Sequence, residues 1–341
     1  MAVLDATRLS LADATKRIDP DGSPALMAEL LTQTNQHIED MVVKQGNLPT
    51  GEQVTVRTGY PTVFYRAINQ GVPDSKSTSA QITEGIAMLE TRNSIDVKLA
   101  RMFGPPDEFR AQESIAFIDA LGQTQASGLF YGNPVTDPKQ YLGFAGRYSL
   151  KAAGNGQNIL DAGGTGGSMT SIWIVGWSTQ SIYTHYPKGL QGGLLHQNLG
   201  EMTIQNSDGT KFQAYADVFQ WDLGLAVKDW RYAVRIANVD VTALLAGTGT
   251  QALTAGTHVF KLMNRGLARF PDSAQNMTKM AIYMNRSVFS GCAIAAMDKS
   301  QNVFGVSEGL SQFGTPLKWL TFQGIPIRKV DALLNTETQV T

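Results

Sequence analysis

The chain has few of the residues that metal and redox chemistry require. Among its 341 residues there is one cysteine, Cys292, and there are four histidines. A single cysteine excludes an internal disulfide and a thiolate zinc site, and it fits a reducing compartment. The histidines, His37, His185, His196 and His258, contain no pair at the i,i+4 spacing of a helical metal site. We therefore expect no metal centre and no cofactor.

Charge and long apolar runs are also scarce. Only 17% of the residues are charged, against about 25% in an average globular protein, and the net charge is -1. Tight binding to a nucleic-acid backbone is disfavoured, because it needs clustered cations. No run of about 18 apolar residues is present to span a membrane, and residues 1–11 lack the apolar core of a signal peptide. We expect a cytoplasmic protein, unless it is packaged into something larger.

Residues 1–48 and 49–103 differ in the spacing of their apolar residues. Residues 1–48 carry a turn signal at Asp19–Gly22 and one short amphipathic helix that Ser23 and Pro24 open, so we interpret them as an arm. Residues 49–103 alternate between apolar and polar, which is the period of a strand. The alternating residues are Val54, Val56, Val63 and Tyr65, and then Ile86, Met88, Ile95, Val97 and Leu99.

A polar segment, residues 69–79, separates these two alternating stretches. We therefore predict a long two-stranded hairpin over residues 52–102 with a flexible tip. An isolated hairpin is only marginally stable in water, so this one needs another surface to lie upon, and a neighbouring subunit is the surface we expect. The tip residues that we take as candidates for the subunit contact are Gly71, Val72, Pro73, Asp74, Ser75 and Lys76.

The rest of the chain predicts helices and strands in mixed order. Pro105 and Pro106 break the chain, and the acids at 107–108 suit the first turn of a helix that we extend to about residue 129. The later patterns predict the α+β class. They place strands at 171–177, 231–239 and 279–284, a hairpin at 202–216, helices at 258–270 and 286–297, and two closing strands within 319–330.

Two motifs resemble enzyme motifs but lack essential parts. Gly305–Gly309 fits the G-x-S-x-G nucleophile elbow, with Ser307 as the nucleophile. That motif needs a helix after the serine and a histidine later in the chain, whereas the last histidine is His258, so we interpret the segment as a loop. Gly163–Ser168 has the glycines of a phosphate loop but no nearby lysine, and it too is interpreted as a loop.

Three carboxylates lie close together in the sequence, at Asp217, Asp222 and Asp229. They could perform acid–base chemistry or hold a cation, although their spacing is not that of a calcium-binding EF-hand loop. We interpret them as solvated ends of strands. None of these motifs supports a catalytic residue, and we expect that the chain is not an enzyme.

Four segments, in this order, carry a resemblance to a known family. The chain resembles the major capsid proteins of tailed bacteriophages, of the short-tailed type, which have the Hong Kong 97-like fold. The resemblance covers nearly the whole chain. The segments are Ala126–Pro134, Phe219–Val239, Tyr283–Arg286 and Phe322–Leu334.

The resemblance implies a division into named parts. Residues 1–48 would be the N-terminal arm and 49–103 the extended loop, a β-hairpin. Residues 104–140 would be the spine helix and the start of the peripheral domain. The axial domain, with peripheral-domain strands, would occupy 141–320, and the closing strands and C-terminal tail 321–341.

The resemblance also implies partners. The chain would assemble as pentamers and hexamers into an icosahedral shell in the host cytoplasm and end in the virion capsid. It would work with a scaffolding protein, a portal and decoration proteins, and its contact with the packaged double-stranded DNA would be weak and non-specific. Two alternatives remain: an encapsulin-like bacterial compartment, and a cytoplasmic serine hydrolase that uses Ser307.

Overall fold

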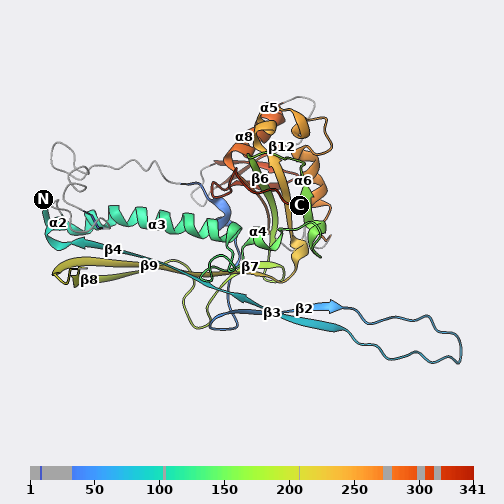
Figure 1. The fold of residues 1–341 in the computed structure, drawn as a ribbon, viewed down its shortest axis with the longest axis horizontal. Coiled ribbons are helices and arrows are strands. Elements are labelled where there is room, and N and C mark those ends of the chain that lie inside the picture. Colours follow the sequence, from blue (N-terminus) through green and yellow to red (C-terminus); the bar gives the residue numbers. More distant parts are fainter. Residues whose placement is uncertain are drawn as a thin grey trace. The chain divides into compact units, whose positions relative to one another are not determined.

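The computed structural model describes residues 8–9, 33–102, 105–206, 208–271, 279–297, 304–310 and 316–341. The chain forms two compact units, and each is built from segments that are distant in the sequence (Figure 1). Unit 1 comprises Met1–Gln33, Met88–Gln125 and Gly193–Asp222, and unit 2 comprises Thr34–Ala87, Ala126–Gly192 and Leu223–Thr341. No helix among the described residues is long and apolar enough to cross a bilayer.

Unit 1 combines helices with a β-hairpin around a small core. Its elements are β4 (Ala87–Asp96), α2 (Val97–Met102), α3 (Pro106–Tyr131), β8 (Leu195–Gln205) and β9 (Lys211–Val227), and the ends of β4, α3 and β9 belong to unit 2. Strands β8 and β9 pair antiparallel, with a bulge between Asn198 and Gly200. The buried cluster of unit 1 consists of Ile95, Leu99, Ala100 and Phe109.

Unit 2 is built around β6 (Met169–Trp177), every residue of which is buried. Its antiparallel neighbours are β10 (Ala233–Asp240) and β11 (Lys279–Met284). Side chains of a strand alternate between its two faces, so Ile172 and Ile174 join one apolar cluster and Trp173 joins the other. The first cluster also receives side chains of α5 (Val241–Ala246), α6 (Val259–Leu267) and α8 (Arg286–Met297).

Further strands extend this sheet. Strand β5 (Ile159–Asp161) pairs with β10, and β14 (Ile325–Lys329), β13 (Pro316–Phe322) and β12 (Phe304–Leu310) follow in order beyond β11. On the other side, β7 (Ile182–Tyr186) pairs with β1 (Val43–Gln45) and with the last residues of β9. The short helix α4 (Phe144–Arg147) and the 3-10 helices η1 (Gln36–Glu39), η2 (Gly156–Asn158), η3 (Trp230–Tyr232) and η4 (Gly249–Gln251) complete unit 2.

A two-stranded hairpin projects from unit 2, and residues 60–77 extend from its end as a loop (Figure 1). Its strands are β2 (Gly51–Gly59) and β3 (Thr78–Gly85). The hairpin predicted from the sequence is therefore wrong in its second strand, because residues 87–96 form β4 of unit 1. Val63 and Tyr65 lie in the loop, beyond the end of β2 at Gly59.

Most other predicted elements are confirmed, and so is the α+β class. The predicted helix at 107–129 is α3, and the strand predicted at 171–177 is β6. Two local predictions are wrong. Val97 and Leu99 lie in α2, since Asp96 ends β4 and its carboxylate accepts a hydrogen bond from the N–H of Lys98 at 2.7 Å. Gly305–Gly309 lies in strand β12.

The helix predicted to open at Ser23 lies mostly outside the described residues. Its described end, Gln36–Glu39, is the 3-10 helix η1.

Candidate assembly surfaces

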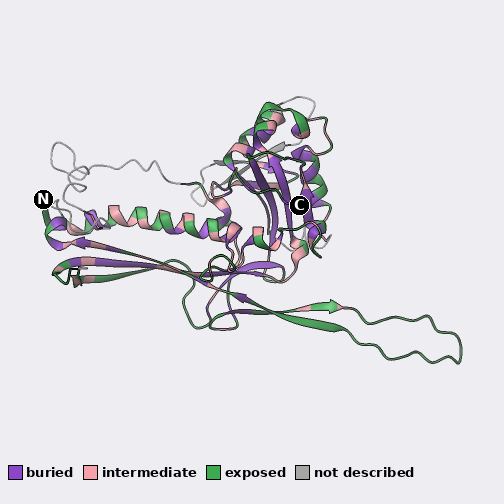
Figure 2. Cartoon of the chain, in the orientation of Figure 1, coloured by how far each residue is buried: buried purple, intermediate pink, exposed green. Residues whose placement is uncertain are grey.

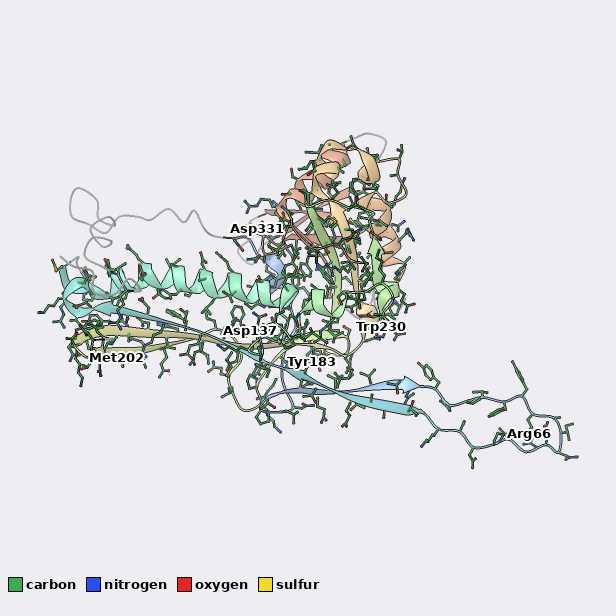
Figure 3. All side chains as sticks on the ribbon, viewed as in Figure 1. Arg66, Asp137, Tyr183, Met202, Trp230 and Asp331 are labelled. Atoms are coloured by element: carbon green, nitrogen blue, oxygen red, sulfur yellow. The ribbon has the colours of Figure 1, made fainter. Side chains whose placement is uncertain are left out.

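The loop between β2 and β3, residues 60–77, exposes large apolar side chains. Tyr60, Val63, Tyr65 and Ile68 are each more than 85% exposed. Figure 3 shows the side chains of this loop, Arg66 among them, standing clear of the other elements. Large apolar side chains that are exposed together in one segment make that segment a candidate for a protein interaction. We call residues 60–68 the apolar stretch.

The tip residues predicted as subunit contacts lie in the returning half of the same loop, after the turn in which the N–H of Gln70 donates to the carbonyl oxygen of Ala67. Gly71, Val72, Pro73, Asp74, Ser75 and Lys76 are all exposed. Of these, only Val72 adds a large apolar side chain, so the apolar stretch offers more contact area than the predicted tip. The sequence does contain a signal for this contact surface, because apolar residues are grouped at 60–68 and have no matching group at 70–77.

The hairpin is attached to unit 2 through two buried glutamates. Glu52 of β2 and Glu84 of β3 face each other directly in the antiparallel register. Glu84 is the one buried residue of β3, and Figure 2 shows the change from buried base to exposed loop along the hairpin. Like charges opposite one another destabilise a strand pair unless other groups compensate them. Both carboxylates therefore require partners from unit 2.

Glu84 has its partner on α4. The guanidinium of Arg147 donates two hydrogen bonds to the Glu84 carboxylate, at 2.7 and 2.6 Å, in the bidentate geometry that makes such pairs strong. Arg147 also donates to the carbonyl oxygens of Leu142 and Leu225. The pair thus joins the hairpin to α4 and to the end of β9.

Glu52 is held by three donors. The hydroxyl of Tyr183 donates to it at 2.8 Å, the N–H of Asn47 at 2.7 Å and the ammonium of Lys44 at 3.3 Å. Burial alone would raise the pKa of Glu52, but these hydrogen bonds favour the ionised form and bring the pKa below its ordinary value. Glu52 is therefore an anion at neutral pH.

A second ionic cluster lies within unit 1. Arg110 of α3 donates to both oxygens of the Asp217 carboxylate, at 2.8 and 3.2 Å, and His196 Nε2 lies 3.0 Å from the same carboxylate. The imidazole of His196 stacks on Phe219, with the ring centroids 4.6 Å apart. Asp217 is buried in the interior of β9, so its predicted position at a solvated strand end is wrong.

The three aspartates do not form one site. Asp217 is in the cluster just described, whereas burial, and to a smaller extent the like charge of Glu90, raise the pKa of Asp222. Asp229 precedes η3 and binds Arg231 at 2.7 Å. No group of three or more His, Cys, Asp or Glu side chains in the described residues is close enough to hold a metal ion.

The remaining candidate motifs also lack catalytic geometry. Ser307 lies within β12 and is paired in register with Trp319 of β13, whereas a nucleophile elbow places its serine in a turn between a strand and a helix. Burial raises the pKa of the Cys292 thiol to about 12, so the thiol stays protonated and unreactive. Gly163–Ser168 leads directly into β6, which begins at Met169, and no helix follows it.

The comparison with protein families decides the identity. The model of the family "Major capsid protein GP7" matches residues 19–341. The chain belongs to this family. It is thus a structural subunit of the capsid shell of a tailed phage, located in the virion capsid, as the sequence predicted. Membership in this family favours the capsid subunit over both alternatives.

Solved structures agree with this assignment. The chain is similar to a chain of bacteriophage Epsilon15, with 29% identity and a TM-score of 0.76 over 100% of both chains, which confirms the Hong Kong 97-like fold. It also matches the capsid of bacteriophage JBD30 at 9% identity and a TM-score of 0.47, over 90% of this chain and 93% of that one. The SrpI encapsulin of Synechococcus elongatus matches at 13% identity and a TM-score of 0.44, over 69% and 98%. No curated protein matches the chain.

Proposed function

We propose that the chain builds an icosahedral shell as pentamers and hexamers, and that the hairpin β2–β3 with its loop is docked on a neighbouring copy. The observation that supports the docking is the apolar stretch. Tyr60, Val63, Tyr65 and Ile68 are each more than 85% exposed, and docking would remove these large apolar side chains from water. A second copy of the chain is the partner that shell assembly provides at high local concentration.

The hairpin itself supports the same proposal. Strand β3 is exposed except at Glu84, and a two-stranded hairpin without a covering layer is marginally stable in water. Docking on a second copy would bury one face of the hairpin and its loop. In this assignment β2, β3 and residues 60–77 are the extended loop, α3 is the spine helix, and the β6 sheet with its helices is the core of the axial domain.

The finer parts of the proposal follow from the family. The shell encloses double-stranded DNA, and assembly takes place in the host cytoplasm with a scaffolding protein, a portal and decoration proteins. A net charge of -1 supports weak and non-specific contact with DNA. The chain acts without catalysis, which the placement of Ser307 inside a paired strand supports. A Ser307→Ala variant that lost a measurable esterase activity would contradict this last part.

The docking is tested by replacing the apolar stretch. A variant with Tyr60→Ser, Val63→Ser, Tyr65→Ser and Ile68→Ser should keep the thermal unfolding midpoint within about 2 °C, since all four side chains are exposed. It should lose closed shells in electron micrographs and in sedimentation. The matched control is Val72→Ser, Asp74→Asn and Lys76→Gln at the tip, which should impair assembly less. Normal shells from the four-fold variant would contradict the docking.

A further inference from the structure

The way in which the hairpin is attached to unit 2 supports an inference beyond the docking. Gly85 and Gly224 are in close contact, because a Cβ on Gly224 would lie 2.5 Å from the carbonyl oxygen of Gly85 and 2.6 Å from the imidazole of His185. The end of β3 therefore lies directly on β9, with no side chain between them. Together with the Glu84–Arg147 and Glu52–Tyr183 contacts, three points fix the end of the hairpin.

These three contacts determine a direction for the hairpin, and on the β2 side Val54 and Val56 add apolar packing against Tyr183 and Ala226. Seven of the eight residues of β3 are exposed, so the strand has few side-chain contacts with unit 2 beyond its base. Strands rise about 3.4 Å per residue, so β3 is about 25 Å long, and a tilt of about 10° at the base moves its far end by about 4 Å. That displacement would carry the apolar stretch off a complementary surface, because packed interfaces tolerate little mismatch.

We propose that Arg147 is a positioning residue for shell assembly: its ion pair with Glu84 fixes the direction of the hairpin β2–β3, and assembly requires that direction. This inference rests on the docking proposed above. Arg147 acts through the hairpin in this proposal, and its other side-chain hydrogen bonds go to the carbonyl oxygens of Leu142 and Leu225.

Charge explains why an arginine is needed here. Without Arg147, the carboxylates of Glu52 and Glu84 would face each other while buried, and Lys44 would be the one cation that the described part of the chain pairs with them. Breaking a buried pair by removing one partner costs far more than the pair itself contributes, because the remaining charge is uncompensated. The hairpin can relieve this cost by swinging its base toward water. Loss of Arg147 should therefore release the hairpin and leave the buried sheet intact.

The same charges should make the release of the hairpin depend on pH in a variant that lacks Arg147. The titratable and charged groups around the site are Lys44 of β1, Glu52 of β2, Glu84 of β3, Arg147 of α4, and Tyr183 and His185 of β7. Burial lowers the pKa of His185, and Arg147 acts in the same direction, while the two carboxylates oppose it. When Arg147 is absent, its part in lowering the pKa of His185 is removed, and a proton taken up by His185 replaces part of the missing positive charge.

In the wild-type protein, acid weakens the hairpin base, and it does so only below the pH range of this comparison. Because the pKa of Glu52 is lowered in the folded state, its stabilisation of the hairpin base is complete above the ordinary value of 4.5 and is lost as the pH falls below that value. Acidification from pH 8 to pH 5.5 should therefore leave the wild-type base unchanged, whereas it should recover part of the lost protection at the base when Arg147 is missing.

The test compares Arg147→Met with the neutral pair Arg147→Met/Glu84→Gln in the full-length chain. At pH 8 we expect Arg147→Met to lose at least about tenfold in hydrogen-exchange protection at the base of β2 and β3, and in the yield of closed shells. Protection in β6 and β10 should stay unchanged. The neutral pair should recover most of both losses, and lowering the pH to 5.5 should recover part of them in Arg147→Met alone.

Two outcomes would overturn the inference. One is normal assembly of Arg147→Met at pH 8. The other is loss of protection in β6 for the neutral pair as well, because Arg147 would then belong to the folding of unit 2. Failure of the docking itself would be separate, since the four-fold apolar variant would then assemble normally whatever Arg147→Met does.

Discussion

Two strands of unit 2, β6 and β3, have almost the same length but opposite surroundings. All nine residues of β6 are buried, and seven of the eight residues of β3 are exposed. Strand β6 has a strand on each side and an apolar cluster on each face, whereas β3 pairs with β2. The difference teaches that β6 is stabilised within one chain, and that β3 depends on its base and, in the proposed docking, on contacts that assembly supplies. Stability and assembly should therefore respond to different substitutions.

The largest expected loss of stability comes from Trp173 of β6. Its ring lies 5.6 Å from that of Phe144 and 5.9 Å from that of Tyr148, and its side chain is fully buried. Trp173→Ala leaves a large cavity and should lower the free energy of unfolding by about 3–5 kcal/mol, measured by denaturant titration. The control Trp173→Phe keeps a ring and removes an indole N–H that has no hydrogen-bond partner, so its loss should be far smaller. Equal losses would show that the ring contacts are not the cause.

A smaller and more local loss is expected from Arg110 of unit 1. Arg110→Met leaves the buried Asp217 carboxylate without its guanidinium partner and with the imidazole of His196 still beside it, which should cost about 3 kcal/mol in unit 1. Hydrogen exchange should show the loss in β8 and β9 and not in β6. The neutral pair Arg110→Met/Asp217→Asn should recover most of it. If the neutral pair were as unstable as Arg110→Met, packing and not charge would explain the effect.

The sequence predicted local features of this fold better than distant ones. The apolar run at 171–177 predicted β6 to within two residues, because a fully buried strand leaves a clear signal. The alternation at Ile95, Val97 and Leu99 was misleading, because it continues from the end of a strand into a six-residue helix that is too short to show its own period. The sequence predicts correctly whether a segment is a helix or a strand where the same pattern of burial continues over several residues.

The ionic contacts could not be predicted in the same way. Arg110 and Asp217 are 107 positions apart, and Arg147 and Glu84 are 63 positions apart. Each residue, taken alone in the sequence, is typical of a solvated surface. Their partners are set by the topology of the units, so the charges at the hairpin base became visible only in three dimensions. The exposed apolar stretch was missed for a related reason, since Val63 and Tyr65 continue the alternation of β2 beyond its end at Gly59.

The smallest effect on stability, with a complete effect on assembly, is expected from shortening the loop. Gly59 and Thr78 are the last paired residues of the hairpin, so replacing residues 60–77 with Asn-Gly closes it with a two-residue turn. The free energy of unfolding of unit 2 should change by less than about 0.5 kcal/mol, because the deleted side chains are exposed.

Hydrogen-exchange protection within β2 and β3 should rise in this shortened chain, since a shorter loop costs less entropy to close. Shells should nevertheless fail to form, as judged by sedimentation and electron microscopy. A matched control replaces only residues 70–77 with glycine and serine, and so keeps the apolar stretch while it changes the tip. If the control were as defective as the shortened chain, the tip and not the apolar stretch would make the contact, and β3 would depend on its partner through residues 71–76.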